Sequence, residues 1–178
     1  MILIFGPAGS GKSLQGQILA ARFNWAWLSM GQLLREENDP KLTKIMDAGD
    51  LVPAEVTNQI ADKAAKKAAK THPQVIMDGY PRSEDQAIAM LTNNWPLNVA
   101  ISLEVPYREL LKRMLLRARP DDTKDAIKER LAIYHRNNTK LMAILSKNGV
   151  KVVKVNGVGT VGQVHDRIMK VLVKCKLV

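Results

Sequence analysis

The chain has 178 residues, 46% of them hydrophobic, which suits one compact domain with a sizeable core and argues against wholesale disorder. No apolar run approaches the roughly 20 residues of a membrane helix, and glycines from Gly6 onward interrupt the first apolar run, so we expect neither a membrane partner nor a signal peptide. The single cysteine, Cys175, excludes an internal disulfide and a structural zinc site built from several cysteines, and it favours a cytoplasmic protein.

The charge is strongly basic, with 27 Lys and Arg against 17 Asp and Glu and a formal net charge of +10. Such a balance fits polyanionic partners, including nucleic acids, acidic membranes and small phosphate compounds. Four of the lysines recur at helical spacing with alanines in the gaps: Lys63, Lys66, Lys67 and Lys70. This spacing is more typical of a solvated helix face than of a binding surface.

Short apolar runs alternate with helical patterns along the chain. The runs that predict buried strands cover residues 1–5, 25–29, 74–77, 99–105 and 150–155. Directly after the first run, Leu14, Ile18 and Ala21 share one face of a predicted helix. Further helical patterns cover residues 31–37, 41–48, 53–71, 83–94, 107–119, 124–147 and 161–174. The alternation predicts an α/β fold with a doubly wound, parallel, five-stranded sheet that carries helices on both faces.

Two polar, turn-rich stretches interrupt this alternation, around residues 30–59 and 118–124. Insertions between the strands of a compact sheet are usually functional when they are ordered. We therefore expect both stretches to serve a binding site rather than the core.

A phosphate-binding loop is predicted at residues 6–13, which have the form G-x-x-x-x-G-K-S. Its glycines let backbone N–H groups point at an anion, and the helix that follows adds the positive end of its dipole. Lys12 can reach terminal phosphates, and the Ser13 hydroxyl can ligate Mg²⁺. The motif follows a predicted strand and opens a helix, which is the context that phosphate binding requires.

Asp78 ends the apolar run at residues 75–77, so it is expected at the carboxyl end of a buried strand, the edge of an open α/β sheet where ligands bind. A carboxylate there can orient water on a Mg²⁺ ion beside the phosphate loop. In isolation, an aspartate that starts a turn before Gly79 would be an equal interpretation. The phosphate loop favours the metal role.

Arginines fall in several separate segments of the chain: Arg35, Arg82, Arg113, Arg117, Arg119 and Arg130. Arg113 and Arg117 are four residues apart and share a helix face, and residues 119–122 form a tight acidic corner before the next helix. A single arginine is most often a surface charge. Six of them in a phosphate-binding chain indicate bidentate contacts to phosphate oxygens.

These motifs, in this order, resemble the nucleoside monophosphate kinases and, within them, the short-lid adenylate kinases. The resemblance covers essentially the whole chain and rests on residues 6–13, 29–35, 49–53, 78–82 with Gln86, and the arginines from Arg113 to Arg130. It implies a phosphate-loop core of residues 1–29, 60–117 and 125–178. It also implies a helical insertion that binds the monophosphate, at residues 30–59, and a short lid at residues 118–124.

The resemblance also implies roles for individual residues. ATP would be bound by Gly6, Ala8, Gly9, Ser10, Gly11, Lys12, Ser13, Leu14, Arg113, Arg117 and Val158. AMP would be bound by Met30, Arg35, Leu51, Val52, Gly79, Arg82, Gln86, Arg119 and Arg130. Transfer would be catalysed by Lys12, Arg82, Arg117, Arg119 and Arg130. Mg²⁺ would be held by Ser13 and, through water, by Asp78.

The chain departs from the family pattern at three of these places. Met30 stands where adenylate kinases usually have threonine, Gln32 where they have an acidic residue, and Leu14 where threonine is frequent. Gln86 favours adenine as the acceptor base, because pyrimidine-specific relatives are expected to have asparagine there. Met30 nevertheless removes a hydroxyl group near the base, so a preference for UMP or CMP stays an alternative.

The resemblance implies a monomeric, Mg²⁺-dependent phosphotransferase that converts ATP and AMP into two ADP. The three histidines, His72, His135 and His165, lie outside the motifs, as expected for transfer that needs no general base. An alternative of another class is an RNA- or ribosome-associated protein with weak kinase activity. The basic charge motivates this alternative. However, only 4% of the residues are aromatic, so the chain has few side chains on which the bases of an RNA could stack. No N-K-x-D motif indicates a GTPase.

Overall fold

The structure is a computed structural model that describes residues 1–117 and 123–178, with Arg117 described by its backbone alone. Within these residues five strands form one parallel sheet in the order β2-β3-β1-β4-β5. The strands are β1 (Ile2–Phe5), β2 (Ala26–Ser29), β3 (Val75–Asp78), β4 (Val99–Glu104) and β5 (Lys151–Asn156). The predicted parallel, five-stranded α/β sheet is therefore confirmed.

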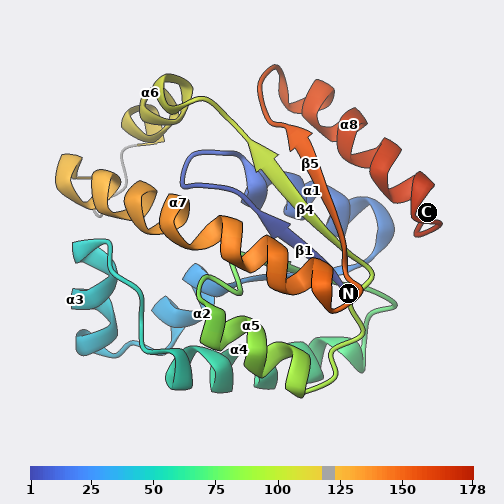
Figure 1. The fold of residues 1–178 in the computed structure, drawn as a ribbon, viewed down its shortest axis with the longest axis horizontal. Helices are drawn as coiled ribbons and strands as arrows, with labels where there is room; N and C mark the ends of the chain where they lie inside the picture. Colours follow the sequence, from blue (N-terminus) through green and yellow to red (C-terminus); the bar gives the residue numbers. More distant parts are fainter. Residues whose placement is uncertain (118–122) are drawn as a thin grey trace.

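Helices cover both faces of this sheet (Figure 1). They are α1 (Lys12–Phe23), α2 (Met30–Glu36), α3 (Pro40–Ala48), α4 (Ala54–Ala69), α5 (Glu84–Thr92), α6 (Tyr107–Arg117), α7 (Lys124–Lys147) and α8 (Val161–Lys174). Polar side chains cap several of them locally, and Thr160 with Gln163 forms a complete capping box at the start of α8. Among the described helices, we find none that is both long and apolar enough to cross a membrane.

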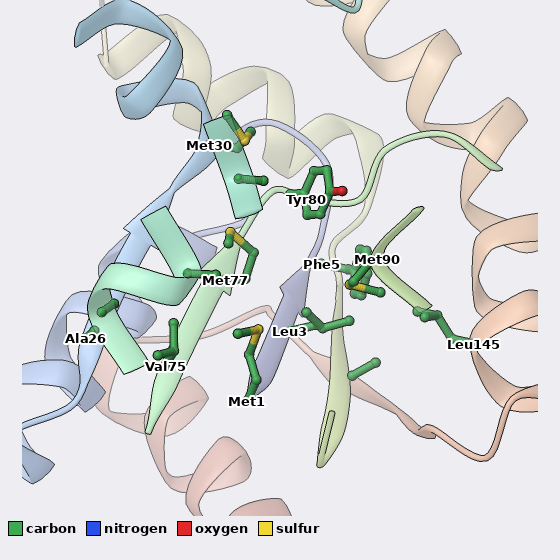
Figure 2. Close-up of a cluster of buried hydrophobic side chains, with 14 of the residues drawn as sticks. Met1, Leu3, Phe5, Ala26, Met30, Val75, Met77, Tyr80, Met90 and Leu145 are labelled. Carbon is green, nitrogen blue, oxygen red and sulfur yellow. The ribbon is translucent and has the colours of Figure 1, made fainter. Parts of the chain in front are cut away.

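The core lies on both sides of the strands, because successive side chains of a strand point to opposite faces. Figure 2 shows one side, where Leu3 and Phe5 of β1 pack with Met77 of β3 and with Tyr80. On the other side, Ile2, Ile4 and Ile76 pack against Leu19 of α1 and Ile168 of α8. A sheet buried on both faces explains why the strands read as continuous apolar runs in the sequence.

Helix α1 forms where it was predicted, but its buried face differs from the one that Leu14, Ile18 and Ala21 share. Leu14 is 45% exposed, whereas Gln15, Gly16 and Leu19 are buried. The side-chain amide of Gln15 is satisfied by hydrogen bonds to the Val161 carbonyl and to His165. Position 16 has room only for glycine, since a Cβ atom there would lie 2.5 Å from the Trp27 ring. The burial of Gln15 and Gly16 beside the apolar Leu19 is therefore explained by hydrogen bonding and close fit.

Candidate active site

Three neighbouring strands end together at the carboxyl edge of the sheet. Asp78, the last residue of β3, pairs in register with Ile4 of β1 on one side and with Ser29 of β2 on the other. The phosphate loop follows β1 directly, so the loop and Asp78 emerge side by side. This is the crevice at the carboxyl ends of the strands where open α/β sheets bind ligands.

A cavity of about 980 Å³ opens at this edge, at the upper end of the range for small-molecule sites. Its walls come from the phosphate loop, α2, α3, the segment after β3, and α7. The predicted site residues that line it are Gly6, Ala8, Gly9, Gly11, Lys12, Ser13, Leu14, Arg35, Leu51, Asp78, Gly79, Arg82, Arg113 and Arg130. The fold thus gathers residues from across the sequence into one site.

The phosphate loop has the backbone conformation that its glycines predict. Gly9 and Gly11 have φ angles of 81° and 90°, in the left-handed region that favours glycine. A Cβ atom on Gly9 would also lie 3.0 Å from the Leu110 carbonyl oxygen, so α6 packs closely against the loop. Lys12 lies at the start of α1, and its Nζ atom donates a 3.4 Å hydrogen bond to the Pro7 carbonyl.

Asp78 is only 2% exposed, and among residues 1–117 and 123–178 neither carboxylate oxygen has a hydrogen-bond partner. A buried carboxylate without a partner is unfavourable unless a cation or ordered water satisfies it. Asp78 and Ser13 both line the cavity. This donor set suits Mg²⁺, which retains several waters and takes few ligands from a protein.

Arg82 lies at the centre of the site and is firmly held. Its backbone N–H donates to Gln86 Oε1 at 2.7 Å, and its Nε donates to the Gly79 carbonyl at 2.7 Å. Arg82 is exposed within the cavity, yet the surrounding protein desolvates its guanidinium and lowers the pKa. Asp78 raises this pKa, while Arg130 and Arg35 lower it further. These couplings show that a carboxylate and three guanidinium groups share one electrostatic environment.

The other arginines reach the cavity from separate elements. Arg35 of α2 donates to the Gly31 carbonyl at 2.9 Å, and Arg130 of α7 donates to the Met46 carbonyl at 3.0 Å. Arg113 of α6 pairs with Glu109 at 2.8 Å and donates to the Gly157 carbonyl at 3.2 Å. Guanidinium groups arranged in this way can bind phosphate oxygens from several directions.

A small recess of about 30 Å³ adjoins the main cavity, and the two share Met46, Asp50, Leu51, Gly79 and Arg82. The recess is also lined by residues that lie deeper in the protein: Met30, Leu34, Val52, Thr57 and Gln86. Met30 is 1% exposed and Gln86 is 2% exposed. The residues predicted around the acceptor base are therefore brought together, beside Arg82.

Some predicted residues are not brought into either cavity. Among those that the structure describes, Ser10 and Val158 line neither one, and Ser10, although part of the phosphate loop, is buried. The Val158 carbonyl accepts a hydrogen bond from Arg167. The side chain of Arg117, all of Arg119 and most of the predicted lid at 118–124 lie outside the described residues.

One wall of the cavity, which α7 provides, was not predicted from the sequence beyond Arg130. Beyond Arg130 this wall contains Ile133, Tyr134, Asn137, Asn138 and Leu141. Their spacing from Arg130 follows the helical repeat, so projecting one helix face from that arginine would have found them. Burial raises the pKa of Tyr134, a hydrogen bond from Ser102 lowers it, and Glu104 raises it. None of the three histidines lines either cavity.

Comparisons with known proteins agree with this arrangement. A family model described as Adenylate kinase matches residues 4–150. The adenylate kinase of Nocardia farcinica is 34% identical over 181 residues, covering 96% of this chain and 98% of the relative. The adenylate kinase of Bifidobacterium longum is 38% identical, with 94% and 97% covered, and that of Mycobacterium leprae (strain TN) is 34% identical, with 97% and 99% covered. Because the family model and these relatives match most of its length, the chain belongs to the adenylate kinase family.

Proposed function

We propose that this protein is a nucleoside monophosphate kinase that transfers the terminal phosphoryl group of ATP to AMP and releases two ADP. The observation that carries the proposal is the continuity of the site. One cavity joins a phosphate loop at one end to an arginine cluster at the other, where the small recess lined by Met30 and Gln86 adjoins it. A phosphatase or a simple nucleotide switch needs one nucleotide site, whereas this cavity suits two nucleotides meeting at their phosphates.

At the donor end, the phosphate loop and Lys12 hold the phosphates of ATP, and Arg113 lies against its adenine. By resemblance to the family, Arg117 and Arg119 belong to this end, and so does Val158, although it lines neither cavity in the structure. Mg²⁺, bound by Ser13 and through water by Asp78, supplies charge neutralisation on the phosphates when it is present. The buried carboxylate of Asp78, which has no hydrogen-bond partner in the part of the chain that the structure describes, supports this role.

At the acceptor end, Arg35 and Arg82 bind the phosphate of AMP, and Arg130 and Arg119 contact the group in transfer. Gln86 recognises the base between Met30, Leu51 and Val52. Because the second pKa of a phosphate monoester is about 6, the acceptor oxygen is already anionic near neutral pH and needs no general base. Catalysis then consists of positioning and charge stabilisation by Lys12 and the arginines.

Water competes with AMP as an acceptor, so the site has to assemble when both nucleotides are bound. We assign this task to the monophosphate-binding insertion at residues 30–59 and the lid at residues 118–124, moving on the phosphate-loop core. In the structure the insertion already lies against α7, since a Cβ atom on Gly49 would be 2.8 Å from the Ala126 carbonyl oxygen. A monomeric, cytoplasmic enzyme is the simplest form of this proposal.

An acceptor screen tests the proposal. Turnover with ATP and Mg²⁺ is measured in a coupled assay with AMP, CMP, UMP or GMP, and we expect AMP to give the highest kcat/KM. A rate with AMP no better than with CMP or UMP would contradict the base assignment. No finding favours a pyrimidine kinase or an RNA-associated protein over the adenylate kinase reading. An RNA titration at several salt concentrations provides the counter-test, because phosphate contacts give a steep salt dependence.

A further inference from the structure

Arg82 is held from a third direction, by a residue outside every motif discussed above. Asn137 of α7 donates a hydrogen bond from its Nδ2 to the Arg82 carbonyl at 3.0 Å. The other two anchors, Gln86 Oε1 and the Gly79 carbonyl, belong to the segment around Arg82 itself or to α5. Among the hydrogen bonds of residues 1–117 and 123–178, only the one from Asn137 connects this arginine to the far wall of the cavity.

We propose that Asn137 is a positioning residue that orients Arg82 toward the phosphate of the acceptor nucleotide. The proposal rests on the proposed kinase function, in which Arg82 contacts that phosphate. By fixing the carbonyl of Arg82, Asn137 restrains the peptide that follows the arginine. The backbone N–H, the carbonyl and the Nε atom of Arg82 are then all constrained, which leaves the terminal nitrogens for a ligand.

Asn137 lies on the same helix, α7, as Arg130. Asn137 lies seven residues after Arg130, about two helical turns or roughly 10 Å along the same face. Both residues line the main cavity. A single rigid helix therefore carries one cavity arginine and the group that sets the orientation of another. The spacing between Arg82 and Arg130 is fixed by α7 rather than by the loop alone.

Another contact joins α7 to the same region, but it does not explain the orientation of Arg82. Lys140 pairs with Glu84 at 3.2 Å, and their side chains are 70% and 46% exposed. Exposed ion pairs of this kind contribute little, because water screens them and both side chains lose freedom. The bond from Asn137 instead ends on Arg82 itself. An arginine that is ordered before binding loses less conformational freedom when it binds phosphate.

The test compares Asn137→Ala and Asn137→Gln with the matched control Asn148→Ala. Asn148, the C-cap residue of α7, also donates from Nδ2 to a carbonyl, that of Ile144, but this bond joins α7 to no other element. In Asn137→Ala we expect kcat/KM for AMP to fall about five- to tenfold, the size of one lost neutral hydrogen bond. The KM for AMP should rise while the KM for ATP stays near the wild-type value. Asn137→Gln keeps the amide donor and should recover part of the loss, and Asn148→Ala should behave as wild type.

A second measurement needs no nucleotide and no activity. Hydrogen exchange of residues 79–86 in the nucleotide-free protein should be faster in Asn137→Ala than in wild type, and unchanged in Asn148→Ala. Unchanged exchange in Asn137→Ala overturns the inference, as does an equal rise in KM for both nucleotides or an equal loss in the control. A wild-type protein without AMP-dependent turnover would instead overturn the proposed function. The exchange comparison would then still decide whether Asn137 fixes the Arg82 segment.

Discussion

The two ends of the cavity are built in different ways. At the proposed donor end, the contiguous residues 6–13 supply the backbone, the lysine and the hydroxyl group. At the proposed acceptor end, the site depends on side chains from separate elements: Met30 of α2, Met46 of α3, Arg82, Gln86 of α5 and Asn137 of α7. The donor end therefore forms from one short segment of the chain, whereas the acceptor end forms only when these separate elements pack correctly. Substitutions at the two ends should therefore fail differently.

The largest effect is expected at the donor end, from Lys12→Ala. The substitution removes a positive charge from the phosphates in the transition state, so we expect kcat to fall by about 10²- to 10³-fold. The midpoint of thermal unfolding, followed by circular dichroism, should change little because Lys12 lines the cavity rather than the core. Lys63→Ala, on an exposed part of α4, is the control. A loss of less than tenfold would mean that the donor end does not depend on this lysine.

At the acceptor end, Arg82→Lys distinguishes the contribution of the positive charge at this position from that of the planar guanidinium group. Lysine keeps the charge but lacks the planar fork, so kcat/KM for AMP should fall by about 10- to 100-fold, with the KM for ATP little changed. Steady-state kinetics with each nucleotide varied in turn provides the measurement. Arg136→Lys is the control, because Arg136 is an exposed arginine on α7 that lines neither cavity. A parallel rise of both KM values would contradict a separate acceptor end.

A smaller effect concerns the helix that carries the phosphate loop. In Gly16→Ala, the added Cβ would lie 2.5 Å from the Trp27 ring, so we expect unfolding free energy to drop by about 1–3 kcal/mol. Gly162→Ala in α8 is the matched control, because no atom lies within 4 Å of its Cβ position, and the change should be neutral or slightly stabilising. Urea unfolding measures both. Equal stability of the two variants would show that α1 does not need this close fit.

The smallest effect is a pH dependence at the contact between α1 and α8. His165 is 8% exposed and bonds to Gln15 and Arg22. Burial lowers the pKa of His165, the charge of Arg22 lowers it further, and Asp166 raises it. In the unfolded chain this histidine has an ordinary pKa of about 6.5, so it takes up a proton at a higher pH than in the folded protein. As the pH falls through about 6.5, the unfolded chain therefore binds more protons, and the free energy of unfolding decreases. Well above this pH the histidine is neutral in both states, so it does not lower the free energy of unfolding.

His165→Gln keeps a hydrogen-bonding side chain but removes the titration. We expect the unfolding free energy of the wild type to decline more steeply than that of His165→Gln between about pH 7.5 and pH 5.5. Urea unfolding across this range compares the two proteins. Parallel curves would show that His165 does not contribute to the pH dependence.

Much of the fold could be predicted because its signals are local. The bounds of α7 and α8 agree with the helical patterns at 124–147 and 161–174, and both helices begin at a threonine whose side chain caps the first turn. The face of α1 that Leu14, Ile18 and Ala21 share is not its buried face, because Gly16 is buried for its lack of a side chain and Gln15 for its hydrogen bonds. Neither property appears in a hydrophobic pattern.

By itself, the amino-acid sequence determined the order of strands and helices along the chain, the phosphate loop, and the position of Asp78 at the end of a buried strand, since each depends on neighbours within a few residues. Only the tertiary structure decided that Met30, Met46 and Gln86 share one recess, and that Asn137 meets Arg82 across the cavity. Those contacts join residues far apart in the chain. They follow from how α7, α5 and the α2–α3 insertion pack on the sheet, which depends on the shapes of whole elements rather than on any local pattern.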